Sequence, residues 1–231
     1  MIVAGGSEYP AGNYAGRQPR VMFSKNGAAW SLPQRVLERD HWLWRVTWHK
    51  GRAYGVSKYG SPSKEMPDNP RRTNLVTSKD GVRWETITEL KVPGGDETTL
   101  RFSGDRLIAL MRRTWQDGNI AWVGSSVHPY KEWQWKPAGS FIGGPNFIVL
   151  KQDRMIAGGR VFPGGDAKRP ATTLGTLTLD GFAPVLSLPS GGDTSYPGFV
   201  FHDGLLWAMY YSSHEEKTGI YLARVRVSNQ K

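Results

Sequence analysis

Short apolar runs separated by turn residues recur along the whole chain. In the segment 192–211 one apolar run ends at Asp203-Gly204 and a second follows directly. An Asp-Gly pair between two strand-like runs is a strong hairpin signal. The segment 95–112 repeats this layout around Gly104-Asp105. The pattern predicts an all-β chain built from copies of one hairpin unit.

The hairpin turns recur at a period of about 50 residues, a length typical of propeller repeats, at Gly51, Gly104, Asp153 and Gly204. Blades of this kind have four strands and stack around a central channel. The sequence therefore predicts a single-domain, five-bladed β-propeller with four-stranded antiparallel blades; a tandem of hairpin sandwiches is the alternative. The expected repeats are 1–38, 39–91, 92–140, 141–189 and 190–231.

The two terminal repeats are expected to be incomplete. Counting back one period from Gly51 reaches Met1, so the first blade should lack its inner strand. Ser228 falls where the next turn motif would start, so the last blade should lack its outer strand. These positions suggest a truncated chain, or a ring that is completed by strand exchange or in a homo-oligomer.

The apolar runs predict individual strands with turns between them. The expected strands are Met1–Ser7, Arg20–Phe23, Gln34–Leu37, Trp42–Trp48, Ala53–Lys58, Asn74–Thr77, Thr86–Leu90, Asn119–Ser125, Trp133–Trp135, Thr172–Thr178 and Ile220–Val227.

Composition narrows the functional classes. The chain of 231 residues has no cysteine, which excludes disulfides and thiol chemistry. Its formal net charge of +10 is compatible with a basic surface or an anionic ligand, but the scattered Lys and Arg argue against a nucleic-acid partner. No apolar run approaches the roughly 18 residues of a membrane span. The start lacks the features of a signal peptide, which leaves the compartment undetermined.

Aligning the repeats on their turns gives two columns of residues that should lie near the channel. The end of the second strand carries Ser7, Lys58, Arg112, Arg160 and Tyr211. The start of the inner strand carries Leu43, Glu97, Pro145 and Tyr196. Arginine suits bidentate recognition of a carboxylate, so three cations in one ring would form a carboxylate cradle. The alternative is that each cation pairs separately with an Asp or Glu on a neighbouring blade.

Two segments share the pattern Ser-x-Asx-Gly-x-x-Trp, at 24–30 and 78–84. The Asx-Gly pair predicts a tight turn, and the Trp can fold back over the blade edge. This pattern resembles the Asp-box, or bacterial neuraminidase repeat, of sialidase-like propellers. The order Arg45, Glu97, Arg112 or Arg113, Arg160, Tyr196 also resembles the order of functional residues in that family.

The resemblance implies a role for each matched residue. Arg45, Arg112 and Arg160 would bind a sugar carboxylate. Tyr196 would be the nucleophile, and Glu97 would take its proton. A neutral phenol suits attack on an anomeric carbon that already bears a carboxylate.

A leaving-group acid and further ligand contacts complete the expected site. Asp68, in a polar loop, is the best candidate acid. His214, just past Tyr211, could act as an acid or base at the channel mouth. The predicted substrate-binding residues are Arg45, Arg112, Arg113, Arg160, Tyr211, His214 and Asn146. The five histidines show no metal-ligand spacing, so we predict no metal and no cofactor.

The sequence also departs from the family. Sialidases have six blades, position 47 is Thr where the family has Pro, and the expected late Tyr-Glu pair is Tyr210-Tyr211. We therefore expect a sialidase-like, carbohydrate-active propeller that hydrolyses or binds a glycan, acidic glycans included. The alternative is a non-catalytic propeller that binds glycan or protein, or a truncated or engineered scaffold.

Overall fold

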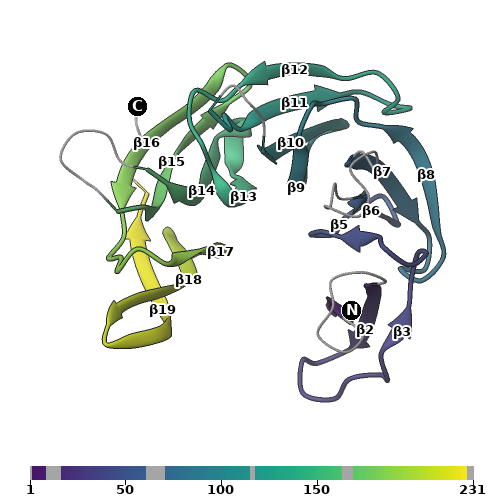
Figure 1. Cartoon of the computed structure of the whole chain (residues 1–231), viewed down its shortest axis with the longest axis horizontal. Coiled ribbons are helices and arrows are strands. Elements are labelled where there is room, and N and C mark those ends of the chain that lie inside the picture. Colours follow the sequence, from purple (N-terminus) through teal and green to yellow (C-terminus); the bar gives the residue numbers. More distant parts are fainter. Residues whose placement is uncertain (1, 9–16, 61–70, 115–117, 163–168, 228–231) are drawn as a thin grey trace, which may run out of the picture. The chain divides into compact units, whose positions relative to one another are not determined.

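A computed structural model describes residues 2–8, 17–60, 71–114, 118–162 and 169–227. These residues form nineteen strands in five antiparallel sheets, and the strands of each sheet are consecutive in the chain (Figure 1). The first sheet contains β1 (Ile2–Glu8), β2 (Gln18–Ser24) and β3 (Gln34–Arg35). The second contains β4 (Trp42–Leu43), β5 (Thr47–His49), β6 (Arg52–Tyr59), β7 (Arg72–Ser78) and β8 (Trp84–Glu89).

The third sheet contains β9 (Gly95–Ser103), β10 (Arg106–Arg113), β11 (Trp122–Ser126) and β12 (Gln134–Pro137). The fourth contains β13 (Gly143–Val149), β14 (Met155–Val161), β15 (Ala171–Thr178) and β16 (Gly181–Ser187). The fifth contains β17 (Thr194–His202), β18 (Leu205–Glu215) and β19 (Lys217–Arg226).

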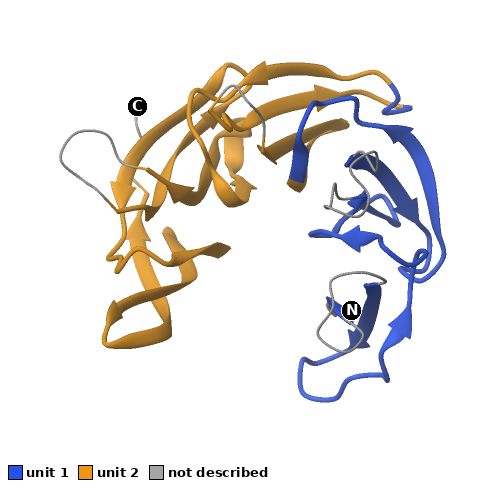
Figure 2. Cartoon of the chain, viewed as in Figure 1, with its two compact units in different colours: residues 1–96, 129–131 blue, residues 97–128, 132–231 orange. Residues whose placement is uncertain are grey.

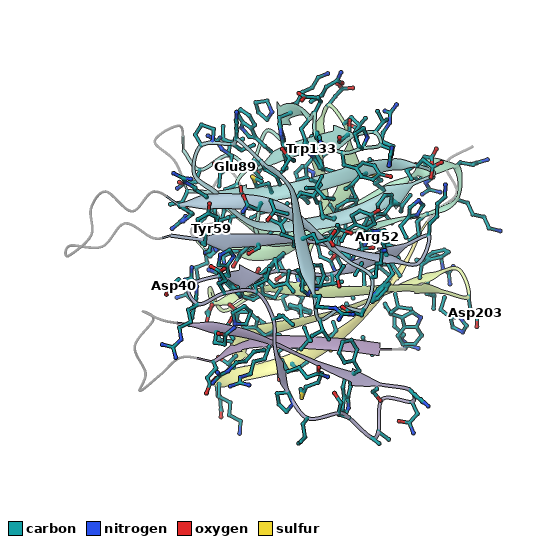
Figure 3. All side chains as sticks on the ribbon, turned by 90° about the vertical axis from the view of Figure 1, so that its right-hand side faces the viewer. Asp40, Arg52, Tyr59, Glu89, Trp133 and Asp203 are labelled. Atoms are coloured by element: carbon teal, nitrogen blue, oxygen red, sulfur yellow. The ribbon has the colours of Figure 1, made fainter. Side chains whose placement is uncertain are left out.

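The fold class is the five-bladed β-propeller that the repeat predicts. Each sheet is an up-and-down meander; in the second sheet β4 and β5 together form the inner strand, and both pair with β6. The first and last sheets have three strands each among the described residues, as the repeat alignment predicts. The turn at Asp203-Gly204 has positive φ angles of 49° and 75°, and Asp203 lies at the tip of the β17–β18 turn (Figure 3).

The chain divides into two compact units, coloured separately in Figure 2. Unit 1 comprises residues 1–96 and 129–131, and unit 2 comprises residues 97–128 and 132–231. The expected single domain stays a prediction. In the described part of the chain no helix is long and apolar enough to cross a membrane.

A one-residue bulge interrupts three inner strands. The predicted strand Trp42–Trp48 is wrong as a continuous element, because β4 ends at Leu43, opposite Ser57, and β5 resumes at Thr47, opposite Tyr54. Three residues thus face two, which is the definition of a bulge. The registers of β13 and β17 shift in the same way near their starts. Bulges re-aim side chains, and the bulges of β13 and β17 lie where the candidate site of unit 2 begins.

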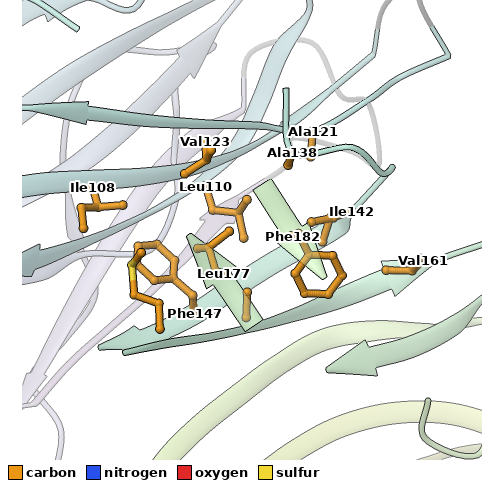
Figure 4. Close-up of a cluster of buried hydrophobic side chains, with 12 residues drawn as sticks. Ile108, Leu110, Ala121, Val123, Ala138, Ile142, Phe147, Val161, Leu177 and Phe182 are labelled. Atoms are coloured by element: carbon orange, nitrogen blue, oxygen red, sulfur yellow. The ribbon is translucent and has the colours of Figure 1, made fainter. Parts of the chain in front are cut away.

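The core of unit 2 is layered between consecutive sheets. One cluster joins the third and fourth sheets (Figure 4); it contains Ile108, Leu110, Ala121, Val123, Ala138, Ile142, Phe147, Met155, Ala157, Val161, Leu177 and Phe182. A second cluster joins the fourth and fifth sheets through Leu174, Leu188, Leu206, Ala208 and Tyr210. Alternate residues of β18 face this second cluster, as period-two strands require.

The two Ser-x-Asx-Gly-x-x-Trp segments in unit 1 have the same hydrogen bonds. In the second segment, Gly81 N–H donates to Ser78 Oγ at 2.8 Å, and the Trp84 indole N–H donates to the Gly81 carbonyl at 3.0 Å. In the first segment the corresponding distances are 2.7 Å and 3.0 Å. Backbone N–H donors lower the pKa of Asp80 to about 2. Both segments are turns closed by their own side chains.

Candidate functional site

Glu97 is the centre of the candidate site in unit 2. Its side chain is 1% exposed and lies at the start of β9. Its Oε2 accepts from Arg112 Nη1 at 3.0 Å and from Gly144 N–H at 2.9 Å. Its Oε1 accepts from the Tyr196 hydroxyl at 2.9 Å. The carboxylate is thus held on two sides, and its third contact is a phenol.

Tyr196 reaches Glu97 because β17 bulges at this residue. Ser195 pairs with Tyr211 and Gly198 with Met209, so Tyr196 and Pro197 share one opposing residue. Tyr196 has φ of +53°, which is rare for an aromatic residue, and it is 40% exposed. Backbone in such regions is held by its surroundings and clusters at functional sites.

Burial, and to a smaller extent the adjacent Glu97 carboxylate, raise the pKa of Tyr196 to about 12. Arg112 acts in the opposite direction. The phenol is therefore protonated at neutral pH, and its proton is already shared with a carboxylate that can accept it.

The neighbouring inner strand supports this geometry. Gly143 pairs with Arg160 just as Ser195 pairs with Tyr211, so the register aligns Gly144, not Pro145, with Tyr196. The expected position of Pro145 in the column with Tyr196 is one residue off, because the turn after β13 has three residues, 151–153, whereas the turn after β17 has two, 203–204.

Gly144 has φ of +57°. An added Cβ would lie 2.5 Å from Ser195 Oγ and 2.6 Å from Tyr196 Cδ1. The absence of a side chain here leaves the space that the tyrosine ring occupies.

Asn146 is buried rather than at the surface. It is 2% exposed, and its amide donates to the Pro197 carbonyl at 2.8 Å. Arg101 donates to its carbonyl oxygen at 3.0 Å. Because Pro197 follows Tyr196, this contact fixes the bulge that presents the phenol. Asn146 therefore helps to position Tyr196, and its contact with substrate stays a prediction.

A second tyrosine–carboxylate–arginine group lies beside the first. The Tyr211 ring stacks on Tyr196 with centroids 5.9 Å apart and an interplanar angle of 24°. Its hydroxyl donates to Asp193 Oδ1 at 2.8 Å. Arg160 Nη2 lies 2.7 Å from the Tyr211 hydroxyl and 3.1 Å from Asp193. Burial and the bond to Asp193 raise the pKa of Tyr211.

Each cation of the predicted ring has a carboxylate partner. Arg112 pairs with Glu97, and Arg160 pairs with Asp193. In unit 1, Lys58 Nζ lies 2.6 Å from Asp96 Oδ1, and Arg71 binds the other oxygen at 3.1 Å. Lys58 and Arg160 thus pair separately with a carboxylate of the next sheet, as the alternative to an open carboxylate cradle expects, whereas Arg112 pairs within its own sheet. Asp193 was not among the predicted site residues. The sequence signal that could have found it is the Gly-Asp pair, which opens β9 as Gly95-Asp96 and recurs just before β17 as Gly192-Asp193.

The remaining predicted residues are placed as follows. Arg113 is 1% exposed, donates to the Ile120 carbonyl at 3.2 Å and lies over the Trp122 ring at 4.5 Å, so its contacts are structural. His214 bonds with Ser212 at 3.0 Å, and its ring lies 4.2 Å from that of Tyr221.

The other two predicted residues lie outside the described part of unit 2. Arg45 belongs to unit 1, where its guanidinium lies 5.9 Å from the Trp44 ring centroid. Asp68 lies outside the described residues. The roles assigned to both residues stay predictions. Among the described residues, no group of three or more His, Cys, Asp or Glu could hold a metal ion.

Comparison with solved structures identifies similar folds at low identity. A protein of unknown function from Dyadobacter fermentans superposes with a TM-score of 0.78 at 16% identity, covering 96% of this chain and 67% of that one. A GH32 β-fructofuranosidase from Bombyx mori gives a TM-score of 0.66 at 13% identity, covering 98% of this chain and 58% of that one. An endo-arabinase from Bacteroides thetaiotaomicron gives 0.64 at 13% identity, covering 99% and 91%.

These likenesses show a shared propeller fold. The chain spans about two thirds of the Dyadobacter protein and 58% of the Bombyx enzyme. No protein-family model matches the sequence, and no curated protein matches it significantly. The similar structures include glycoside hydrolases of the GH32 and GH43 types.

Proposed function

We propose that the protein is a carbohydrate-active propeller, and that unit 2 hydrolyses a glycosidic bond with Tyr196 as nucleophile and Glu97 as its base, in the manner of sialidases. The observation that carries this proposal is the 2.9 Å contact between the Tyr196 hydroxyl and Glu97 Oε1. The glycoside hydrolases among the similar structures support carbohydrate as the ligand class.

The first step is attack of Tyr196 Oη on the anomeric carbon. The phenolic proton passes to Glu97 Oε1 as the new C–O bond forms, and the bond to the leaving oxygen breaks. An acid protonates that oxygen; Asp68 stays the predicted donor. In the second step water attacks the anomeric carbon and gives its proton to the conjugate base of that acid. Tyr196 then leaves as the phenol, taking its proton back from Glu97.

The raised pKa of Tyr196 is consistent with Tyr196 as the nucleophile and Glu97 as its base. With a pKa of about 12, the phenol does not ionise by itself at neutral pH. Proton transfer to Glu97 must therefore accompany attack, so that removal of the base should lower kcat by about 10² to 10⁴.

The charges of the site bear on the sugar. Arg112 and Glu97 cancel, and so do Arg160 and Asp193. An acidic sugar would have to displace Asp193 from Arg160 to reach the guanidinium. A hydroxyl of a neutral sugar can instead donate to the exposed Asp193 carboxylate and leave its pair with Arg160 intact. We therefore propose a neutral glycan in preference to an acidic one.

The test is release of the aglycone from a panel of aryl glycosides, containing α-arabinofuranoside, β-xyloside and α-sialoside, together with glucose release from sucrose. We expect turnover of at least one neutral substrate, and its loss in Tyr196→Phe and Glu97→Gln. Tyr221→Phe, which removes an exposed hydroxyl bonded to Glu215, is the matched control and should retain activity.

The outcomes separate the candidate functions. Turnover that survives in both Tyr196→Phe and Glu97→Gln contradicts the assigned chemistry. Glycan binding without turnover, unchanged in Tyr196→Phe, favours the non-catalytic alternative, for which the fully paired cations are the motivating observation. If the protein neither turns over nor binds any glycoside of the panel, a carbohydrate function is overturned.

A further inference from the structure

A second hollow lies in unit 2 at the turn end of the third and fourth sheets. Its volume is about 590 Å³, within the range of about 300–1,000 Å³ for small-molecule sites. We propose that it binds a small organic carboxylate with an apolar body. Its lining includes the apolar Ile108, Met155 and Leu177 and the charged Arg106, Asp153 and Arg154.

This hollow is separate from the Tyr196 site. In the fourth sheet, Gly144 lies at the start of β13, and the hollow begins at Gln152, beyond its other end. A seven-residue strand at about 3.3 Å per residue separates the two by roughly 20 Å. The proposal therefore does not depend on the proposed function.

The floor of the hollow is apolar and rigid. Ile108, Met155 and Leu177 are at most 7% exposed and belong to the cluster of Figure 4. Side chains in such a packed layer sit in fixed positions. The floor therefore offers a preformed surface for an aromatic ring or a short aliphatic chain.

Two arginines stand at the rim, from the same position in neighbouring repeats. Arg106 follows the Gly104-Asp105 turn directly, and Arg154 follows the turn at Gln152-Asp153. With Asp153, the charged lining residues are two cations and one anion, a net charge of +1. Guanidinium groups beside an apolar surface favour a planar carboxylate whose body is hydrophobic.

The turn that precedes Arg154 has a left-handed backbone conformation at two residues that are not glycine. Gln152 and Asp153 have φ of +58° and +57°, whereas the corresponding turns at Gly51, Gly104 and Gly204 each contain glycine. Two non-glycine residues in this conformation cost about 1–3 kcal/mol each, and such strain persists where the surroundings impose it.

Asp153 is also held by a hydrogen bond that its Oδ1 accepts from Ser103, the last residue of β9. The two turns are thus joined across the hollow's edge. The left-handed Gln152-Asp153 turn and the packed apolar floor indicate a preformed pocket, and Arg106 and Arg154 give its lining two cations.

The experiment is titration of the purified protein with phenylacetate and, in parallel, with neutral phenylacetamide, followed by isothermal calorimetry at low salt. We expect phenylacetate to bind with a Kd below 1 mM, and the amide at least about tenfold more weakly, because it lacks the charge that the arginines recognise.

Two variants and one control locate the binding. Arg154→Gln removes one cation, and Thr176→Trp fills the hollow from an exposed position; each should weaken phenylacetate binding at least about tenfold while thermal unfolding shows a folded protein. Arg226→Gln, an exposed arginine on the fifth sheet, should leave binding unchanged. Failure of phenylacetate to bind, or equal binding of acid and amide, overturns the proposal. So does binding that survives Thr176→Trp.

Discussion

Gly144→Ala tests the idea that a missing side chain makes room for Tyr196. The new methyl carbon would lie 2.5 Å from Ser195 Oγ and 2.6 Å from Tyr196 Cδ1, where ordinary contacts need about 3.5 Å. Both neighbours are fixed, because Ser195 donates to the Gly143 carbonyl at 2.7 Å and Tyr196 is held by Glu97. The backbone or the ring must therefore move.

The expected cost has two parts. An alanine at φ of +57° pays about 1–2 kcal/mol for its left-handed conformation. Overpacking a filled site adds about 1–3 kcal/mol. The free energy of unfolding should thus fall by roughly 2–5 kcal/mol.

Gly104→Ala is the matched control for this substitution. Gly104 also has a positive φ, 55°, in the same unit, but an added Cβ there meets nothing within 4 Å. Gly104→Ala should lower the free energy of unfolding by the conformational part alone, about 1–2 kcal/mol. The difference between the two variants isolates the steric contact with Ser195 and Tyr196.

Urea unfolding of both variants measures the two free energies. The steric reasoning is refuted when Gly144→Ala loses no more stability than Gly104→Ala. On the proposed function, Gly144→Ala should also lower turnover by about 10² or more, because a shift of about 1 Å at a reacting group has that effect. Gly104→Ala should leave turnover unchanged.

Three further outcomes follow from contacts described above. Ser78→Ala should lower the unfolding free energy by about 1–3 kcal/mol, because it leaves the Gly81 N–H without its acceptor; exposed Lys79→Ala, unchanged in urea midpoint, is the control. Since the pKa of Tyr196 rises from 10.0 unfolded to about 12 folded, its contribution should be complete below pH 10 and disappear between pH 10 and 12; urea midpoints of Tyr196→Phe should show a smaller loss in that window, and equal losses would contradict the shift. Asn146→Ala should cost about 1–3 kcal/mol, because the buried Pro197 carbonyl loses its donor; thermal melts equal to those of the parent protein would exclude this contact as a determinant of stability.

The fold could be predicted from the sequence because hairpin turns recur along the chain at a nearly constant spacing. Turn pairs such as Asp203-Gly204 carry their own conformational preference, so their spacing gives the number of sheets. The pairing of Glu97 with Tyr196 was also predictable, because residues at one repeat position face one end of the sheets. These signals are local or strictly periodic, and distant packing does not alter them.

Turn length and bulges are not visible in the periodic pattern. The turn at 151–153 is one residue longer than the turn at 203–204, so Gly144 rather than Pro145 matches Tyr196. Asn146 follows the bulge of β13 and binds the Pro197 carbonyl from a buried position. A bulge depends on how two strands pair, and the alternation of apolar residues does not record it. The recurring Gly-Asp pairs at 95–96 and 192–193 are a sequence signal for Asp193. Only the observed ion pair with Arg160 shows that this aspartate is the partner of the arginine.

The pairing of Lys58 with Asp96 and of Arg160 with Asp193 limits how the repeats can be recombined. Each pair joins the second strand of one sheet to the residues that open the next. A sheet grafted elsewhere would therefore carry half of each bond, leaving Lys58, whose side chain is 11% exposed, without its anion. Breaking a buried pair costs about 3–5 kcal/mol. The smallest exchangeable module is thus a sheet together with the opening residues of its successor.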